Sequence, residues 1–286
     1  MNNSVRGKVA VVTGAGSGIG RQVAFVLAKR GARLAVCDVD DTRLGETADR
    51  ARALGAEVHT AHLDVGDRAA VQRYAADVAA HHGVVHQIYN NAGISGGGQT
   101  VLEADWEVYD RTLAVNLFGV IHGTKAFLPH LIASGDGHVV NVSSLNGYLA
   151  QPTLSAYCAS KFAVRGFTEA LRSEMLTERL PVRVTLVHPG GVKTDIATST
   201  LSQARDLGIT PTPSQLARTR VYNEKLLRMP AEQAARIIVD GVEAGSPRVR
   251  VGSDARNADR LVRLLPRGYP RLTAALERRL FGTAGR

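Results

Sequence analysis

The sequence contains a tyrosine and a lysine four residues apart, Tyr157 and Lys161, in the run Tyr-Cys-Ala-Ser-Lys. If this segment is helical, the two side chains project from one face, one turn apart. A phenol titrates near pH ~10 and is a poor base at neutral pH. A neighbouring ammonium lowers that pKa, which would let Tyr157 exchange a proton near neutral pH. Such a pair also suits a plain solvated helix face, so its meaning depends on other motifs.

A strand, a glycine-rich turn and a helix follow one another near the N-terminus. The β-branched run from Val9 to Thr13 is typical of a strand buried on both faces. The turn at 14–20 reads Gly-Ala-Gly-Ser-Gly-Ile-Gly, and the helix after it ends at Gly31. Glycines let the main chain approach a pyrophosphate, and a helix N-terminus offers free N–H groups. We therefore expect a nucleotide cradle of the form Thr-Gly-x-x-x-Gly-x-Gly, with a turn that binds no ligand as the alternative.

An acidic residue, Asp38, ends the second predicted strand, about 20 residues after the glycine turn. A carboxylate at this place accepts hydrogen bonds from the adenosine ribose hydroxyls and repels a 2′-phosphate. Arg21 and Arg43 are the cations expected nearest to this carboxylate. Asp38 therefore favours NAD(H) over NADP(H), unless it serves only as a helix cap.

Further motifs follow in a fixed order. They are Thr13-Gly14 to Gly20, Asp64-Val65, Asn90-Asn91-Ala92-Gly93, Asn116, Ser143-Ser144, Tyr157 with Lys161, and Pro189-Gly190 to Thr194. With these motifs the chain resembles the short-chain dehydrogenase/reductase family in its single-domain form, from about Gly7 to Val251. The resemblance implies hydride transfer between a nicotinamide cofactor and a secondary alcohol or ketone.

The resemblance assigns four catalytic residues. Tyr157 is the general acid or base, and Lys161 lowers its pKa and holds the nicotinamide ribose. The family's serine precedes its tyrosine by 13 positions, which selects Ser144 rather than Ser143 to bind the substrate oxygen. Asn116 lies in an apolar helical segment, where it either joins two helices or, by resemblance, holds a water that links Lys161 to solvent. No Gly-x-Ser-x-Gly elbow is present, so a serine hydrolase is not expected.

The resemblance also assigns the residues that bind the cofactor. Asp64 binds the adenine amino group, and the main chain of Val65 lines the ring. Val192 and Thr194 bind the carboxamide, although the preceding Pro-Gly-Gly also suits a plain turn. Asn90 is expected to brace neighbouring strands instead. The full predicted set is Gly14, Ser17, Gly18, Ile19, Gly20, Asp38, Asp64, Val65, Asn91, Ala92, Gly93, Tyr157, Lys161, Pro189, Gly190, Val192 and Thr194.

The long connection at 195–229 contains Pro211 and Pro213 and is typical of a lid or substrate-binding loop. Its apolar residues are Ile196, Leu201, Leu207, Ile209, Leu216, Val221, Tyr222, Leu226 and Leu227. They favour a lipophilic substrate, or else they dock the lid on the domain.

Length and composition predict one large α/β domain. The chain has 286 residues, of which 44% are hydrophobic, and this is enough for a substantial core. Alternating strands and helices predict a doubly wound, mostly parallel seven-stranded sheet with helices on both faces, a Rossmann-like fold. We expect residues 1–252 to form the dinucleotide-binding catalytic domain and 253–286 to form a basic C-terminal helical extension.

The net charge of +9 is concentrated in that extension. From Ser246 to Arg286, ten arginines stand against three acidic residues, a net charge of +7. Leucines at helical spacing form two segments separated by Pro266 and Pro270. We expect the extension to pack on its own domain or on another subunit of a homodimer or homotetramer. Peripheral contact with an anionic membrane is the alternative, and nucleic-acid binding is not expected because no binding motif accompanies the charge.

Other features point to the cytoplasm. The first eight residues are too short and polar for a signal peptide, and no apolar run reaches the length of a membrane span. Cys37 and Cys158 are too few for a disulfide framework. No metal site is expected, because the adjacent His81 and His82 are typical of a solvated helix end and no cysteine–histidine ligand spacing occurs.

The sequence therefore predicts an NAD(H)-dependent oxidoreductase that interconverts a small-molecule alcohol and ketone, with a lipophilic substrate. The same chemistry with NADP(H) is one alternative. A non-catalytic regulator that binds NAD(H) is the other.

Overall fold

A computed structural model of the chain describes residues 3–96, 98–196, 210 and 213–282. Its main sheet has seven strands, all parallel, in the order β3-β2-β1-β4-β5-β6-β9. The strands are β1 Val9–Thr13, β2 Arg33–Asp38, β3 Val58–His62, β4 Gln87–Asn90, β5 Gly137–Val142, β6 Val182–Pro189 and β9 Arg248–Val251. The predicted fold class is confirmed.

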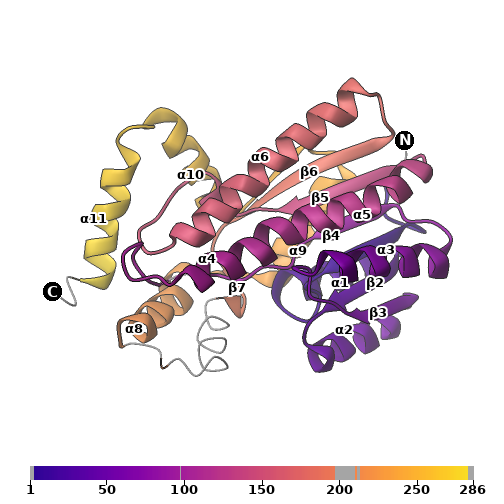
Figure 1. The fold of residues 1–286 in the computed structure, drawn as a ribbon, viewed down its shortest axis with the longest axis horizontal. Coiled ribbons are helices and arrows are strands. Elements are labelled where there is room, and N and C mark those ends of the chain that lie inside the picture. The colour runs from indigo at the N-terminus through magenta and orange to yellow at the C-terminus, as the bar shows by residue number, and fades with distance from the viewer. Residues whose placement is uncertain (1–2, 97, 197–209, 211–212, 283–286) are drawn as a thin grey trace.

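Helices cover both faces of this sheet (Figure 1). On one face lie α1 Gly18–Lys29, α2 Asp41–Ala53 and α9 Ala231–Glu243. On the other lie α3 Arg68–His82, α5 Gly119–Ala133 and α6 Ser155–Thr177. Side chains of a strand alternate between the faces, so Val12 enters the first core layer and Val11 the second. This explains why the strands read as continuous apolar runs.

Shorter elements surround the C-terminal ends of the strands. They are α4 Trp106–Leu113, the π-helical turn η1 Ala114–Phe118, the 3₁₀ turn η2 Leu145–Gly147, α8 Pro213–Val221 and the π-helical turn η3 Tyr222–Leu226. A second, two-stranded parallel sheet pairs β7 Val192–Lys193 with β8 Met229–Pro230. The predicted C-terminal extension forms α10 Ser253–Leu264 and α11 Tyr269–Phe281, which lie at one end of the molecule (Figure 1).

The strand order reverses between β1 and β4. The connections that leave these two strands run to opposite faces of the sheet, and they open a crevice beyond the carboxyl ends of the strands. Asn90, at the end of β4, braces this region. Its amide nitrogen donates to Asn141 Oδ1 at 2.8 Å and to Thr124 Oγ1 at 3.1 Å, so it joins β4 to β5 and α5.

Replacing Asn90 with alanine should destabilise the fold. Asn141 and Thr124 would lose a buried partner, and an unsatisfied buried polar group costs about 1–3 kcal/mol. Urea unfolding measures the change, and the exposed Asn257→Ala is the matched control. Equal stability of the two variants would contradict the bracing role.

Candidate active site

A cavity of about 1000 Å³ lies at the carboxyl ends of the strands. Among the residues predicted to act at a site, those that line it are Gly14, Ser17, Gly18, Ile19, Asp38, Asp64, Val65, Asn91, Ala92, Gly93, Ser144, Tyr157, Lys161, Pro189, Gly190, Val192 and Thr194. Gly20 and Asn116 do not line it. The fold thus gathers residues that are far apart in the sequence into one cavity.

The glycine turn packs closely against neighbouring main chain. Gly14 has φ +64°, and a Cβ there would lie 2.7 Å from the Cα of Ala92. A Cβ at Gly20 would lie 2.1 Å from the carbonyl oxygen of Gly14. Ser17 precedes α1 without a capping bond from its side chain, so the N-terminus of the helix faces the cavity uncapped. Close main-chain approach beside a helix N-terminus is the arrangement that binds phosphate groups.

Asp38 is held at the end of β2 by main-chain donors. Its carboxylate accepts from the Gly16 N–H at 2.7 Å and from the Asp40 N–H at 3.1 Å. The cap of α2 is Asp40, which accepts from the Arg43 N–H at 3.0 Å. The alternative that Asp38 caps this helix is therefore wrong, and its carboxylate lines the cavity.

Asp64 and Val65 line the cavity just beyond β3. Asp64 accepts from the Gly66 N–H at 2.8 Å and from Arg111 at 2.9 Å. Burial opposes ionisation of Asp64, but these two partners hold its pKa below the usual value. The Val65 carbonyl accepts from His122 Nδ1 at 3.0 Å, which fixes the main chain at this point.

The loop after β4 is tied to the glycine turn. The Asn91 amide nitrogen donates to the carbonyls of Thr13 and Gly14 at 3.0 and 3.2 Å. The main-chain N–H groups of Asn91 and Ala92 both donate to Thr13 Oγ1. These bonds hold one wall of the cavity against the other.

Asn116 is fully buried in the π-helical turn between α4 and α5. Its side chain accepts from the Ile94 N–H at 2.8 Å and donates to the Ile94 carbonyl at 2.9 Å and to Ser160 Oγ at 3.1 Å. The amide therefore joins the loop after β4 to α6. Single π-helical turns are frequent at functional sites because they redirect side chains. The water relay stays a prediction.

Lys161 is 3% exposed, and its Nζ donates to the Val142 carbonyl at 3.0 Å. Burial lowers the pKa of this lysine to about 8. The Nζ lies 5.8 Å from the ring centroid of Tyr157. Burial raises the pKa of Tyr157, and a hydrogen bond with Ser144 offsets part of that rise. The predicted direction of the Tyr157 pKa shift is therefore wrong, because burial of the phenol raises the pKa, and the Lys161 ammonium donates to a carbonyl instead.

The two serines have different surroundings. Ser143 Oγ donates to the carbonyl of Lys161 at 2.8 Å, so it anchors α6 to the end of β5. Ser144 Oγ accepts from the Asn146 N–H at 3.1 Å and lines the cavity. Behind it, His188 Nδ1 donates to the Ser144 carbonyl at 2.7 Å. Burial lowers the pKa of His188 to about 3, so this histidine is neutral and acts as a fixed donor.

The Pro-Gly-Gly segment is constrained by neighbours that the sequence did not reveal. The Gly191 N–H donates to Asp254 Oδ2 at 2.6 Å, and a Cβ at Gly190 would lie 2.0 Å from Asp254 Oδ1. A Cβ at Gly191 would lie 2.0 Å from the Leu226 carbonyl oxygen. These glycines are required by close contacts rather than by a turn alone. Asp254, at the start of α10, lines the cavity and was missed because it follows the predicted boundary at 252.

The lid segment is partly helical where the structure describes it. Pro213, which has its φ preset for a first helical turn, begins α8. Main-chain N–H groups of Arg228 and Met229 donate to the Gly191 carbonyl, so the end of the lid is fixed beside the site. Apolar or aromatic lid residues at the cavity are Ile196, Tyr222, Leu226, Leu227 and Met229. Leu201, Leu207 and Ile209 lie outside the described residues.

Comparison with known proteins identifies the family. Residues 8–205 match the family described as short chain dehydrogenase. The chain belongs to this family. It is 50% identical over 273 residues to the putative oxidoreductase SadH of Mycobacterium tuberculosis, with 96% of each chain covered. It is 33% identical over 236 residues to estradiol 17-beta-dehydrogenase 11 of Homo sapiens, covering 81% of this chain and 77% of that protein.

A solved structure agrees. A short chain dehydrogenase/reductase from Burkholderia phymatum, in complex with NAD, has a TM-score of 0.85 and 33% identity, covering 92% of this chain and 95% of that one. The protein is therefore an oxidoreductase that acts on CH–OH groups with a nicotinamide cofactor. Among the described residues, no helix has the length and apolar character needed to cross a bilayer.

The buried Lys161 should make stability depend on pH. Its pKa is about 8 in the folded chain and near 10.5 when unfolded, so the unfolded chain binds more protons between these values and wild-type stability rises with pH there. The Lys161→Met variant lacks this gain. From pH 8 to 10 its unfolding free energy should fall relative to wild type, within a limit of about 3 kcal/mol.

Urea unfolding at several pH values measures this difference. The same substitution at the exposed Lys125, on α5, should leave the pH dependence unchanged. A Lys161→Met curve parallel to wild type would show that the ammonium is not desolvated.

Proposed function

We propose that this protein interconverts a secondary alcohol and a ketone with NAD(H), and that Tyr157 is the general acid or base. The observation that carries the proposal is that Tyr157, Ser144 and Lys161 line the same cavity as the glycine turn and Asp38. A bound nicotinamide supplies or accepts the hydride. The protein must then transfer a proton to or from the substrate oxygen.

The proposed roles follow from the surroundings of each side chain. Burial raises the pKa of Tyr157, so the phenol is protonated at neutral pH and suited to donate a proton during reduction. Ser144 holds the substrate oxygen and stabilises its developing charge. Lys161, with a pKa of about 8, holds the nicotinamide ribose and exchanges protons with solvent through the region of Asn116. A positive nicotinamide ring favours the phenolate needed for oxidation.

The proposed preference for NAD(H) is supported by the charges around Asp38. Two main-chain N–H groups hold this carboxylate at the cavity. The two arginines expected near it are each paired with an acidic residue. Arg21 contacts Glu46 at 3.0 Å, and Arg43 contacts Asp195 at 3.0 Å. A 2′-phosphate would meet a carboxylate, and its binding would disrupt these pairs. The neighbour from Burkholderia phymatum was solved with NAD.

The proposed substrate is lipophilic. Support comes from the apolar lid side chains that face the cavity, among them Ile196, Leu226 and Leu227. A pocket lined by such groups gains free energy from apolar ligand surface. A relative that shares 33% identity is named for estradiol, a lipophilic alcohol.

The C-terminal extension at 253–286 is proposed to pack on the catalytic domain of its own chain. Asp254 bonds to the Gly191 N–H, and Phe281 stacks on Tyr222 of the lid at 6.0 Å between ring centroids. Peripheral membrane contact remains the alternative, because Leu264, Leu272 and other leucines of the extension are exposed among arginines. A homodimer or homotetramer is proposed from the exposed aromatic side chains of Trp106, Phe118 and Phe162.

Tyr157→Phe should lower turnover by about a thousandfold or more while NADH affinity stays near wild type. The change removes only the proton-transferring hydroxyl, and general acid–base catalysis is typically worth 10²–10⁴-fold. Steady-state rates on lipophilic secondary alcohols and their ketones, together with NADH fluorescence titration, measure both quantities. Tyr269→Phe, on α11 away from the cavity lining, is the matched control. Wild-type turnover by Tyr157→Phe would refute the assignment.

Asp38→Asn should reduce the preference for NAD(H) over NADP(H) by about tenfold, a change of ~1.4 kcal/mol. The substitution keeps the shape and removes the charge that opposes a 2′-phosphate. The measurement is the ratio of kcat/KM for the two cofactors. Asp41→Asn, a neighbouring carboxylate outside the cavity lining, should leave the ratio unchanged. A wild-type enzyme that prefers NADP(H) would contradict the role of Asp38.

A further inference from the structure

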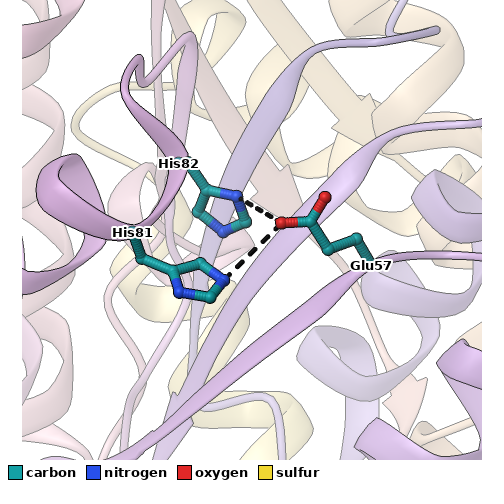
Figure 2. Close-up of side chains that lie close together, drawn as sticks. All are labelled: Glu57, His81 and His82. Atoms are coloured by element: carbon teal, nitrogen blue, oxygen red, sulfur yellow. Dashed lines mark ion pairs between the residues drawn. The ribbon is translucent and has the colours of Figure 1, made fainter.

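Three polar side chains converge at the edge of the sheet, away from the cavity. Glu57 immediately precedes the edge strand β3, and His81 and His82 end α3 (Figure 2). This is the amino end of β3, whereas the cavity lies at the carboxyl ends of the strands. None of the three residues lines the cavity, so the cluster has no part in the proposed reaction.

Both histidines approach the same carboxylate oxygen. His82 Nδ1 lies 3.2 Å and His81 Nε2 lies 3.6 Å from Glu57 Oε1, and the three ligand atoms all lie within 4.8 Å of one another (Figure 2). In a tetrahedral zinc site with bonds of about 2.0–2.1 Å, ligand atoms are about 3.3 Å apart. The spacing of the two histidine–carboxylate pairs therefore matches that of a metal site.

His82 has unsatisfied hydrogen-bonding groups. Its side chain is 0% exposed, and neither ring nitrogen has a hydrogen-bond partner in the part of the chain that the structure describes. The 3.2 Å approach to Glu57 therefore lacks the geometry of a hydrogen bond. A buried polar group without a partner is costly, so a ligand or a water molecule is expected to bind it. The sequence-based expectation of a solvated helix end is wrong for this residue.

A third imidazole lies beside the cluster. The ring centroid of His59 on β3 is 4.8 Å from that of His81. Neutral imidazole is the form of histidine that binds metal ions.

We propose that Glu57, His81 and His82 bind a Zn²⁺ ion, with water as the fourth ligand. Two imidazole nitrogens and one carboxylate oxygen form a donor set that zinc accepts. Bound metal would connect the C-terminal end of α3 to the edge strand, whose opposite end leads into Asp64 and Val65. The ion is a stabilising element of the sheet edge, and the site is independent of the proposed oxidoreductase activity.

The test uses the full chain without an affinity tag, after dialysis against a chelator. Calorimetric titration with Zn²⁺ at pH 7.5 should show that one ion binds per chain. The ion should also raise the Tm of the chain, because it binds the folded state. Glu57→Gln and His81→Ala should each weaken binding by about tenfold or more. Both residues are exposed, so these variants should fold, and the Tm of each metal-free variant verifies this.

A matched control is present on the same strand. His62 Nδ1 lies 3.1 Å from Asp41 Oδ1, which is a comparable histidine–carboxylate contact without a second histidine in it. His62→Ala should therefore bind Zn²⁺ like wild type. The proposal is overturned if wild type shows no saturable binding, or if Glu57→Gln and His81→Ala bind as tightly as His62→Ala.

Discussion

Desolvation of Lys161 is the constraint on which the rest of the site depends. A buried ammonium is costly unless its environment supplies polar partners, and here burial brings its pKa down to about 8. The surrounding elements supply those partners at fixed places. The Val142 carbonyl at the end of β5 accepts from the ammonium, and Ser143 binds the lysine's own carbonyl. Ser144 comes next in the chain and faces the cavity. The site thus retains a buried lysine whose desolvation lowers the stability of the fold.

Close main-chain contacts hold the remaining parts around this lysine. Gly14 and Gly20 admit neighbouring backbone at the glycine turn, Gly190 admits the Asp254 carboxylate, and Gly191 admits the Leu226 carbonyl at the end of the lid. Each of these contacts would collide with a Cβ. Glycine is therefore required at several positions on and beside the cavity wall.

Local patterns in the sequence were sufficient for the strands, the glycine turn and the two C-terminal helices. β-Branched runs such as Val9 to Thr13 need burial on both faces, and Pro266 and Pro270 separate α10 from α11. The predicted direction of the Tyr157 pKa shift was wrong, because desolvation depends on tertiary packing, which no local sequence pattern records. The burial of His82 was missed for the same reason, and Asp254 was missed because it lies beyond the predicted domain boundary at 252.

The central claim is that a protonated Tyr157 supplies the proton when a ketone is reduced. The most direct test is the pH dependence of the single-turnover rate of ketone reduction by enzyme preloaded with NADH. The account predicts a rate that is constant through neutral pH and falls through one ionisation near or above pH ~10, where the phenol loses its proton. A rate that increases with pH, or that falls through an ionisation near neutral pH, would contradict it.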